Sequence, residues 1–202
     1  MLKILYKMLE DSKVYNISQK LLGGDKAFRA IKETIARQLS GVSYNNVLDV
    51  GCGTGLFMDC FEGDYMGIDI NYDYMKRARG KKKGDFIVAD ATRLHILNEK
   101  FDIVFNLGVL HHLNIQQRRR MLLEMRRVGK RGGHILIVDG LVPSDRSNVI
   151  GFILAKLDRG RYKMRIEDFM DMISLAYGDN SQMIYTCIKS FPHEFVSVVL
   201  QT

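Results

Sequence analysis

The feature that most constrains this chain is a glycine-rich turn at residues 47–55, which read Val-Leu-Asp-Val-Gly-Cys-Gly-Thr-Gly. An aliphatic run carries an acid, Asp49, near its end, and three alternating glycines lead into the apolar segment 56–61. Glycine reaches positive φ and leaves no Cβ in the way of a ligand, so such a turn usually cradles a bound group. The pattern predicts a strand, a tight turn and a helix, with a ligand at the turn.

The spacing of the glycines limits what that ligand can be. Dinucleotide-binding turns carry G-x-G-x-x-G and leave a helix N-terminus for a pyrophosphate. This turn reads acid-x-G-x-G-x-G instead, and the chain has no G-x-x-x-x-G-K-[ST] loop for a nucleotide triphosphate. The spacing therefore argues against both of these phosphate-bearing ligands.

Three more strands are predicted after the turn, each with a polar side chain at or near its end. Residues 65–70 end in Asp69 and Ile70, residues 85–91 contain Asp90, and residues 101–106 end in Asn106. Asp69 follows the acid of the turn at the distance where an acid on the second strand meets ribose hydroxyls in a mononucleotide-binding βαβ unit. We therefore expect Asp69 and Asp90 to share one crevice with the turn. A helix N-cap is the alternative role for either acid.

The strand at 101–106 leads into residues 107–113, which contain the adjacent pair His111 and His112. His112 is suited to take a proton from a substrate hydroxyl, because an imidazole has a pKa near neutrality. The alternative is that a histidine here only shapes the wall of a pocket. No metal site is expected, because the sequence places no third ligand beside the pair.

Together these segments resemble the class I S-adenosylmethionine-dependent methyltransferases. The glycine turn resembles the family's first motif, Asp69 with Asn71 the second, and the Leu-His-His run the fourth motif in its small-molecule form. The chain lacks the Asn-Pro-Pro-Tyr or Asp-Pro-Pro-Tyr of enzymes that methylate amide or base nitrogens. It departs from the family at 94–96, where Leu-His-Ile replaces a frequent Leu-Pro-Phe.

The resemblance implies S-adenosyl-L-methionine as cofactor and S-adenosyl-L-homocysteine as product. The glycine turn would hold the methionine end, Asp90 would accept from the adenine amino group, and the Ala91 backbone would address a ring nitrogen. The implied catalytic candidates are His112 and His111. The implied cofactor-binding residues are Asp49, Gly51, Cys52, Gly53, Gly55, Asp69, Ile70, Asp90, Ala91 and Asn106.

The predicted fold is α/β, with a Rossmann-like, doubly wound sheet and helices on both of its faces. The sheet is mostly parallel with an antiparallel final strand, in the order 3-2-1-4-5-7-6 that the resemblance implies. A single methyltransferase domain is expected over residues 1–202. Its parts are an N-terminal helical cap (1–40), a cofactor-binding core (42–140), a helical insertion over the acceptor site (141–180) and a terminal β-hairpin (181–202).

The composition, 47% hydrophobic and 26% charged, is that of a globular protein. Three scattered cysteines without a C-x-x-C indicate reduced thiols. The chain shows no signal-peptide pattern and no apolar run that could span a bilayer, so a cytoplasmic location is expected. The net charge of +7 invites an acidic partner, but the basic residues occur in loops and on helix faces that are ordinarily solvated.

We expect methyl transfer to a small-molecule acceptor, carried out by a monomer or a homodimer. One alternative is a methyltransferase that acts on RNA, or on a membrane-associated lipid through peripheral membrane contact. The other is a non-catalytic module that binds S-adenosylmethionine only as a ligand.

Overall fold

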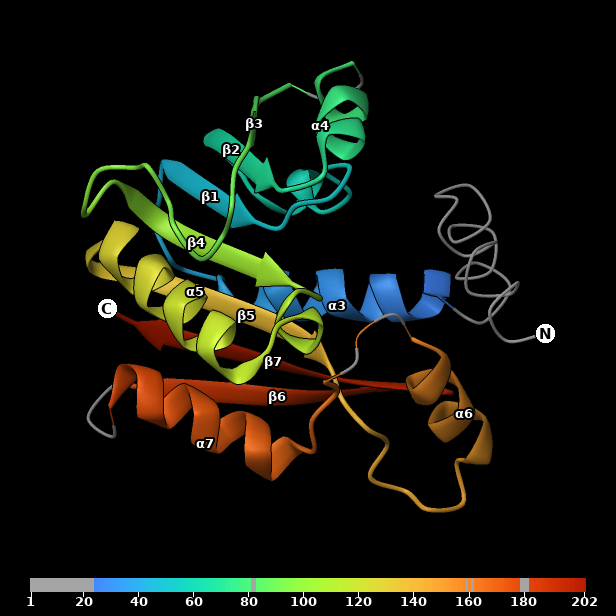
Figure 1. The fold of residues 1–202 in the computed structure, drawn as a ribbon. Helices are drawn as coiled ribbons and strands as arrows, with labels where there is room; N and C mark the ends of the chain where they lie inside the picture. Colours follow the sequence, from blue (N-terminus) through green and yellow to red (C-terminus); the bar gives the residue numbers. More distant parts are fainter. Residues whose placement is uncertain (1–23, 81–82, 159, 161, 179–181) are drawn as a thin grey trace.

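A seven-stranded sheet with the order β3-β2-β1-β4-β5-β7-β6 is the centre of the computed structural model, which describes residues 24–80, 83–158, 160, 162–178 and 182–202. The first five strands pair in parallel, and β7 runs antiparallel to both of its neighbours. The predicted fold class and strand order are therefore confirmed (Figure 1). The strands are β1 (Asn46–Val50), β2 (Asp64–Asp69), β3 (Asp85–Val88), β4 (Phe101–Leu107), β5 (Gly129–Gly140), β6 (Met183–Ser190) and β7 (His193–Gln201).

Helices cover both faces of the sheet (Figure 1). They are α3 (Gly24–Gln38), α4 (Tyr72–Arg79), α5 (Ile115–Val128), α6 (Val149–Leu157) and α7 (Ile166–Tyr177). Val47 of β1 packs in the same core cluster as residues of α3 and α4, whereas the next residue, Leu48, packs with residues of α5 and α7. Both side chains are fully buried, as the central strand of a sheet covered on both faces requires.

The segment after the glycine turn differs from its prediction. Residues 56–61 do not form an α-helix but a short 3₁₀ turn, η1 (Met58–Cys60). Gly63, with φ of 83°, already redirects the chain toward β2, and a Cβ there would lie 2.2 Å from the Asn45 carbonyl oxygen. Too few residues remain between the two glycine-controlled bends for a helix of ordinary length.

Helix α5 begins at a capping box formed by Asn114 and Gln117. The basic residues on helix faces were expected to be solvated, but Arg118 of α5 is buried, and its Nε donates to the Leu110 carbonyl just after β4.

The two segments that flank the core differ in what they contribute. The part of the predicted N-terminal cap at residues 1–23 lies outside the described residues. In the 141–180 segment, α7 buries Phe169 and Ile173 in the main core and is a layer of the sheet structure. Helix α6 instead is anchored to the β6–β7 turn, where the Asn148 side chain donates to the Pro192 carbonyl at 3.0 Å. Among the described residues, no helix combines the length and apolar character needed to cross a bilayer.

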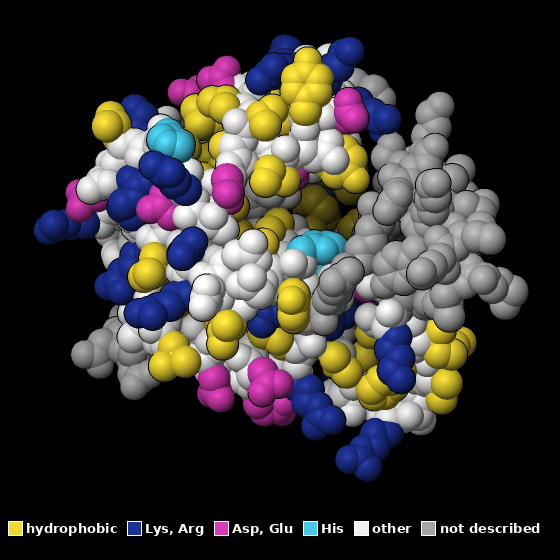
Figure 2. Space-filling view, in the orientation of Figure 1, with side chains coloured by type: hydrophobic (Ala, Val, Ile, Leu, Met, Phe, Trp, Pro, Cys, Tyr) yellow, Lys and Arg dark blue, Asp and Glu magenta, His cyan; other side chains and the backbone are white. Residues whose placement is uncertain are grey.

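The carboxyl ends of β1, β2, β4 and β5 lie at one edge of the sheet (Figure 1). Strands β1 and β4 are neighbours although they are not consecutive, so the winding of the sheet reverses between them. Ligands of doubly wound sheets bind outside this switch point. In the same orientation, Figure 2 shows a hollow beyond these strand ends, bordered in part by hydrophobic side chains.

Candidate active site

The glycine turn adopts backbone conformations that favour glycine. The three φ angles are 79° at Gly51, 55° at Gly53 and 71° at Gly55. A Cβ on Gly51 would lie 2.2 Å from the Val109 side chain, whereas one on Gly53 would meet no atom within 4 Å. The turn therefore packs against the exit of β4 at Gly51 and leaves open space beside Gly53.

Asp69, at the end of β2, lies directly beside this turn. Its Oδ2 accepts from the Gly53 N–H at 2.9 Å, and its Oδ1 accepts from the Asn71 N–H at 2.8 Å. The backbone thus orients both oxygens, each of which has a further lone pair for another donor. The next residue, Ile70, exposes 73% of its surface at the same edge. The sequence-distant turn and acid therefore meet, while their contacts with a cofactor stay predictions.

Asp49 lies beneath the turn and is 2% exposed. The Tyr65 hydroxyl, from β2, donates to its carboxylate. Burial raises the pKa of Asp49 to about 7, although the Tyr65 hydrogen bond lowers it, and the nearby charge of Asp69 adds to the rise. A positively charged ligand bound near this carboxyl would favour its ionised form.

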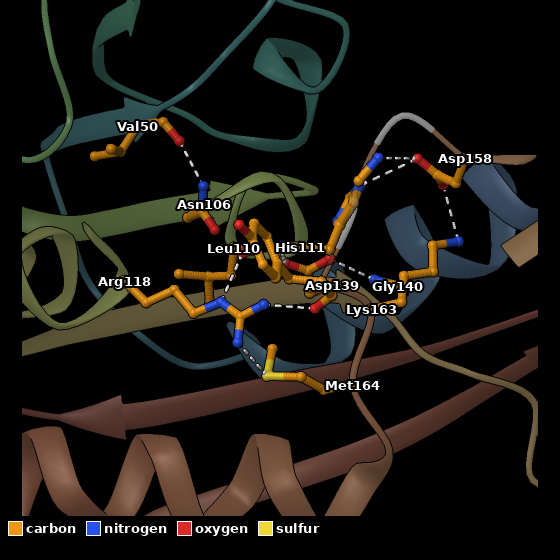
Figure 3. Close-up of polar contacts among 12 residues, drawn as sticks. Val50, Asn106, Leu110, His111, Arg118, Asp139, Gly140, Asp158, Lys163 and Met164 are labelled. Atoms are coloured by element: carbon orange, nitrogen blue, oxygen red, sulfur yellow. Dashed lines mark hydrogen bonds and ion pairs between the residues drawn. The ribbon is translucent and has the colours of Figure 1, made fainter. Parts of the chain in front are cut away.

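Asn106, near the end of β4, is fully buried, and only one end of its side-chain amide has a hydrogen-bond partner among the described residues. Its Nδ2 donates to the Val50 carbonyl at 2.6 Å (Figure 3). Its Oδ1 has no hydrogen-bond partner among the described residues. An unsatisfied buried acceptor costs about 1–3 kcal/mol, and a ligand ammonium or hydroxyl would remove that cost. Asn106 thus offers an acceptor for a group bound between the ends of β1 and β4, and its contact with a cofactor stays a prediction.

Asp90 and Ala91 follow β3 along the same edge. The Ala89 N–H donates to the Asp69 carbonyl at 3.1 Å, which places this segment next to β2. Oδ1 of Asp90 accepts from the backbone N–H and the hydroxyl of Thr92, both at 2.8 Å. The exposed Asp90 side chain is thus held in a local turn, and its contact with adenine remains a prediction.

His111 and His112 belong to the short turn η2 (Leu110–His112), directly after β4. Asp139, at the end of β5, accepts from the His111 backbone N–H at 3.2 Å and also contacts His111 Nδ1 (Figure 3). The other ring nitrogen, Nε2, lies 3.6 Å from Asp158 Oδ1. Burial alone would lower the pKa of His111, but the two carboxylates outweigh it and raise the pKa to about 9. His111 is thus a fixed ring, whereas the side chain of His112 is exposed.

Residues between α6 and α7 pack onto the histidine pair. A Cβ on Gly160 would lie 1.9 Å from His111 Cδ2, so only glycine fits there. The Tyr162 N–H donates to the His111 carbonyl at 3.1 Å. Arg118 donates to the carbonyls of Leu110 and Tyr162 at 2.9 and 2.5 Å, which fastens this segment to the start of α5. The segment that follows β4 is therefore held by Asp139 of β5 and by the residues between α6 and α7.

Four residues of this site were assigned no role there from the sequence. They are Tyr65, Arg118, Asp139 and Asp158. The position of Asp139 at the end of the fifth strand was an available signal, because strand ends carry the site in this fold class. Nothing in the sequence places Asp158 near His111, which lies 47 positions earlier in the chain.

A separate cavity of about 340 Å³ lies away from the glycine turn, between the segment after β5, the start of α7 and the β6–β7 hairpin. Its lining includes three basic side chains, Arg146, Arg165 and Lys189, and apolar side chains such as Phe152. None of the site residues predicted from the sequence lines it.

The residues at the carboxyl edge fit S-adenosylmethionine better than a dinucleotide. The orphaned Asn106 Oδ1 suits a donor such as the methionine ammonium, the oriented Asp69 carboxylate suits ribose hydroxyls, and the space beside Gly53 admits the ligand. No helix N-terminus follows the turn to bind a pyrophosphate, because η1 has three residues. The fold and this site fit a class I, S-adenosylmethionine-dependent methyltransferase domain.

Comparison with known proteins agrees with this class. Residues 48–137, rather less than half of the chain, match the family described as methyltransferase domain. The chain is similar to the tRNA (carboxymethyluridine(34)-5-O)-methyltransferase of Arabidopsis thaliana, with 36% identity over 96 residues, 45% of this chain and 23% of that protein. It is also similar to the malonyl-[acyl-carrier protein] O-methyltransferase of Hamiltonella defensa, with 31% identity over 94 residues, 45% of this chain and 36% of that protein. The matched stretch thus spans well under half of either relative.

Among solved structures, the fold is shared with an S-adenosylmethionine-dependent methyltransferase from Archaeoglobus fulgidus. The TM-score is 0.67 at 16% identity, and the match covers 93% of this chain and 99% of the other. At this identity the likeness concerns the fold alone, and it extends over nearly the whole chain.

Proposed function

We propose that this protein transfers the methyl group of S-adenosylmethionine to a small-molecule acceptor. The observation that carries the proposal is the meeting of three features at one sheet edge: the open glycine turn, the oriented Asp69 carboxylate and the unsatisfied Asn106 oxygen. The absence of an Asn-Pro-Pro-Tyr or Asp-Pro-Pro-Tyr run after β4 supports an acceptor other than an amide or base nitrogen.

The task of the protein in this reaction is mainly to position the reactants. The cofactor supplies an activated methyl on a sulfonium, which an acceptor lone pair attacks in line. Asp69 and Asn106 would fix the cofactor, so that the methyl faces the η2 turn and the acceptor approaches from that side. The exposed His112 would accept the proton of a hydroxyl acceptor, and His111 would hold the turn in place through Asp139.

The acceptor side would be framed by α6 and by the residues that pack on His111. Helix α6 exposes Val149, Ile150 and Ile153, and it is anchored beside the β6–β7 turn. Gly160 and Tyr162 contact His111 directly. Of the 141–180 segment, this part and not the core helix α7 would then select the acceptor.

RNA is the second candidate acceptor, favoured by the likeness to a tRNA methyltransferase and by the net charge of +7. Several basic side chains already have partners within the chain, which reduces the number available for phosphates. Arg118 bonds carbonyls, Arg127 pairs with Glu124 and Lys130 with Asp102. These three side chains are therefore less available to the phosphates of an RNA acceptor.

The choice can be tested with methyl-labelled S-adenosylmethionine and two acceptor pools from one cell extract, the small metabolites and the total RNA. We expect label in the metabolite pool, and none when Asp69→Ala replaces the wild-type chain. Label confined to RNA would overturn the small-molecule acceptor in favour of the alternative. Cofactor binding without transfer to any pool would contradict the enzymatic function and leave a binding module.

A further inference from the structure

We propose that His111, His112 and Asp158 form a binding site for a divalent transition-metal ion, with Zn²⁺ as its simplest occupant. One ligand atom from each of these residues lies within 4.8 Å of the other two. Among the described residues, no other group of three histidine, cysteine or acidic side chains has its ligand atoms this close together. The site goes beyond methyl transfer, because binding of the ion does not depend on S-adenosylmethionine.

The distances suit a small tetrahedral or five-coordinate ion. Two ligands at about 2.0–2.1 Å from a tetrahedral zinc lie about 3.3 Å apart. His111 Nε2 and Asp158 Oδ1 are 3.6 Å apart, so an ion between them requires only a small adjustment. The ligand set of two imidazoles and one carboxylate is that of catalytic zinc sites and of non-haem iron sites, both of which keep positions open for a substrate.

The surroundings of His111 match those of a metal ligand. A ligating histidine usually directs its second ring nitrogen to a carboxylate, which fixes the ring. Here Asp139, buried at the end of β5, contacts Nδ1 and leaves Nε2 facing Asp158 (Figure 3). Binding of the ion requires a neutral His111 ring and therefore releases any proton held at Nε2.

Asp158 and His112 complete the site beside His111. Lys163 holds Oδ2 of Asp158 at 2.9 Å, and the Gly160 N–H donates to Oδ1 at 2.9 Å, so the carboxylate is fixed toward the ring. His112 is exposed, which gives an ion a path from solvent. An acceptor hydroxyl on such an ion would lose its proton more readily, and the proton would then pass to solvent, because a metal-bound His112 ring could not accept it. This last role rests on the proposed function, whereas the site itself does not.

The test is calorimetric titration of zinc chloride into the full chain after chelator treatment. We expect one Zn²⁺ per chain, no comparable binding of Mg²⁺, which prefers oxygen ligands, and a visible absorption spectrum when Co²⁺ is the probe. His112→Gln and Asp158→Asn should each weaken zinc binding by about tenfold or more. His112 is exposed, so its variant should keep the wild-type melting temperature.

Matched controls separate this site from unspecific zinc binding. His95→Gln removes another exposed histidine, and Cys187→Ser removes the exposed thiol, so neither should change the affinity. Failure of the wild-type chain to bind zinc, or unchanged affinity in either His112→Gln or Asp158→Asn, would overturn the proposal. Cofactor binding is measured in a separate titration, so failure of the metal site and failure of the methyltransferase function can be distinguished.

Discussion

Asp49 is almost completely buried beneath the glycine turn, and this burial raises its pKa to about 7 from an ordinary value of 3.8. Between these two values the folded chain retains a proton that the unfolded chain has released. The free energy of unfolding must therefore fall as the pH rises through this range, and this effect levels off above about pH 7. The acid under the turn thus makes the ligand-free protein less stable at neutral pH than at mildly acidic pH.

The substitution Asp49→Asn tests this effect. The amide oxygen can still accept from the Tyr65 hydroxyl but cannot ionise. Between pH 5 and pH 8, the free energy of unfolding of the variant should gain about 2–3 kcal/mol relative to the wild type, because the variant has no buried charge to form. Denaturant unfolding of both proteins at the two pH values measures this difference, and parallel pH profiles would contradict it.

The sequence made some site residues predictable and left others hidden. Asp69 was found because its distance from the turn is set by the local βαβ unit. Its partner Gly53 is likewise part of a local pattern. Asp139 and Asp158 contact His111 because β5 and the α6–α7 connection pack against the β4 exit. Of these two acids only Asp139, at a strand end, had a signal in the sequence.

At the scale of elements, α7 is part of the core and does not merely cover the acceptor side of the sheet. Phe169 is fully buried in the main core, and the Tyr177 hydroxyl donates to the Leu122 carbonyl of α5 at 2.9 Å. We expect Phe169→Ala to lower the free energy of unfolding by about 3–5 kcal/mol, as large-to-small changes in a core do. Urea unfolding followed by circular dichroism measures the loss.

Leu175→Ala on the same helix is the matched control. Leu175 is 88% exposed, so its truncation should change the free energy of unfolding by less than about 0.5 kcal/mol. A Phe169→Ala variant as stable as Leu175→Ala would show that α7 is not part of the cooperative core.

The wrong prediction of a helix at residues 56–61 has a physical reason. Its apolar residues have helical spacing, and Phe57 is indeed buried. The bend at Gly63 limits the length of the segment, however, and helix nucleation is not repaid over so few residues. The apolar periodicity therefore predicted that side chains such as Phe57 are buried, but it did not predict the backbone conformation of the segment.

At the scale of the molecule, the α/β class was predictable because buried strands alternate with amphipathic helices along most of the chain, whereas the order of the sheet came from the resemblance to class I methyltransferases. The antiparallel hairpin of β6 and β7 followed from two β-rich runs around Pro192. The sequence did not show which part of the 141–180 segment packs in the core, as α7 does, and which part lies at the sheet edge, as α6 does. This difference depends on α7 packing against α5, a contact between helices far apart in the chain.

The net charge of +7 is also a property of the whole molecule, and the structure changes its interpretation. Arg118 and Arg127, expected on the outside of α5, bind carbonyl oxygens of the chain itself. Charge that ties segments together is not available to recognise a phosphate backbone. A high count of basic residues therefore predicts an acidic partner less well than the exposed subset of them does.

The central claim is that the crevice at the β1–β4 switch holds S-adenosylmethionine, and calorimetric titration of the cofactor tests it most directly. We expect one cofactor per chain and about a tenfold or greater loss of affinity in Asp69→Ala, because hydrogen bonds to a charged group contribute about 1.5–3 kcal/mol. Asp73→Ala, which removes an exposed acid in the first turn of α4, should bind like the wild type. Absence of heat with S-adenosylmethionine, together with clear binding of NAD, would contradict the account.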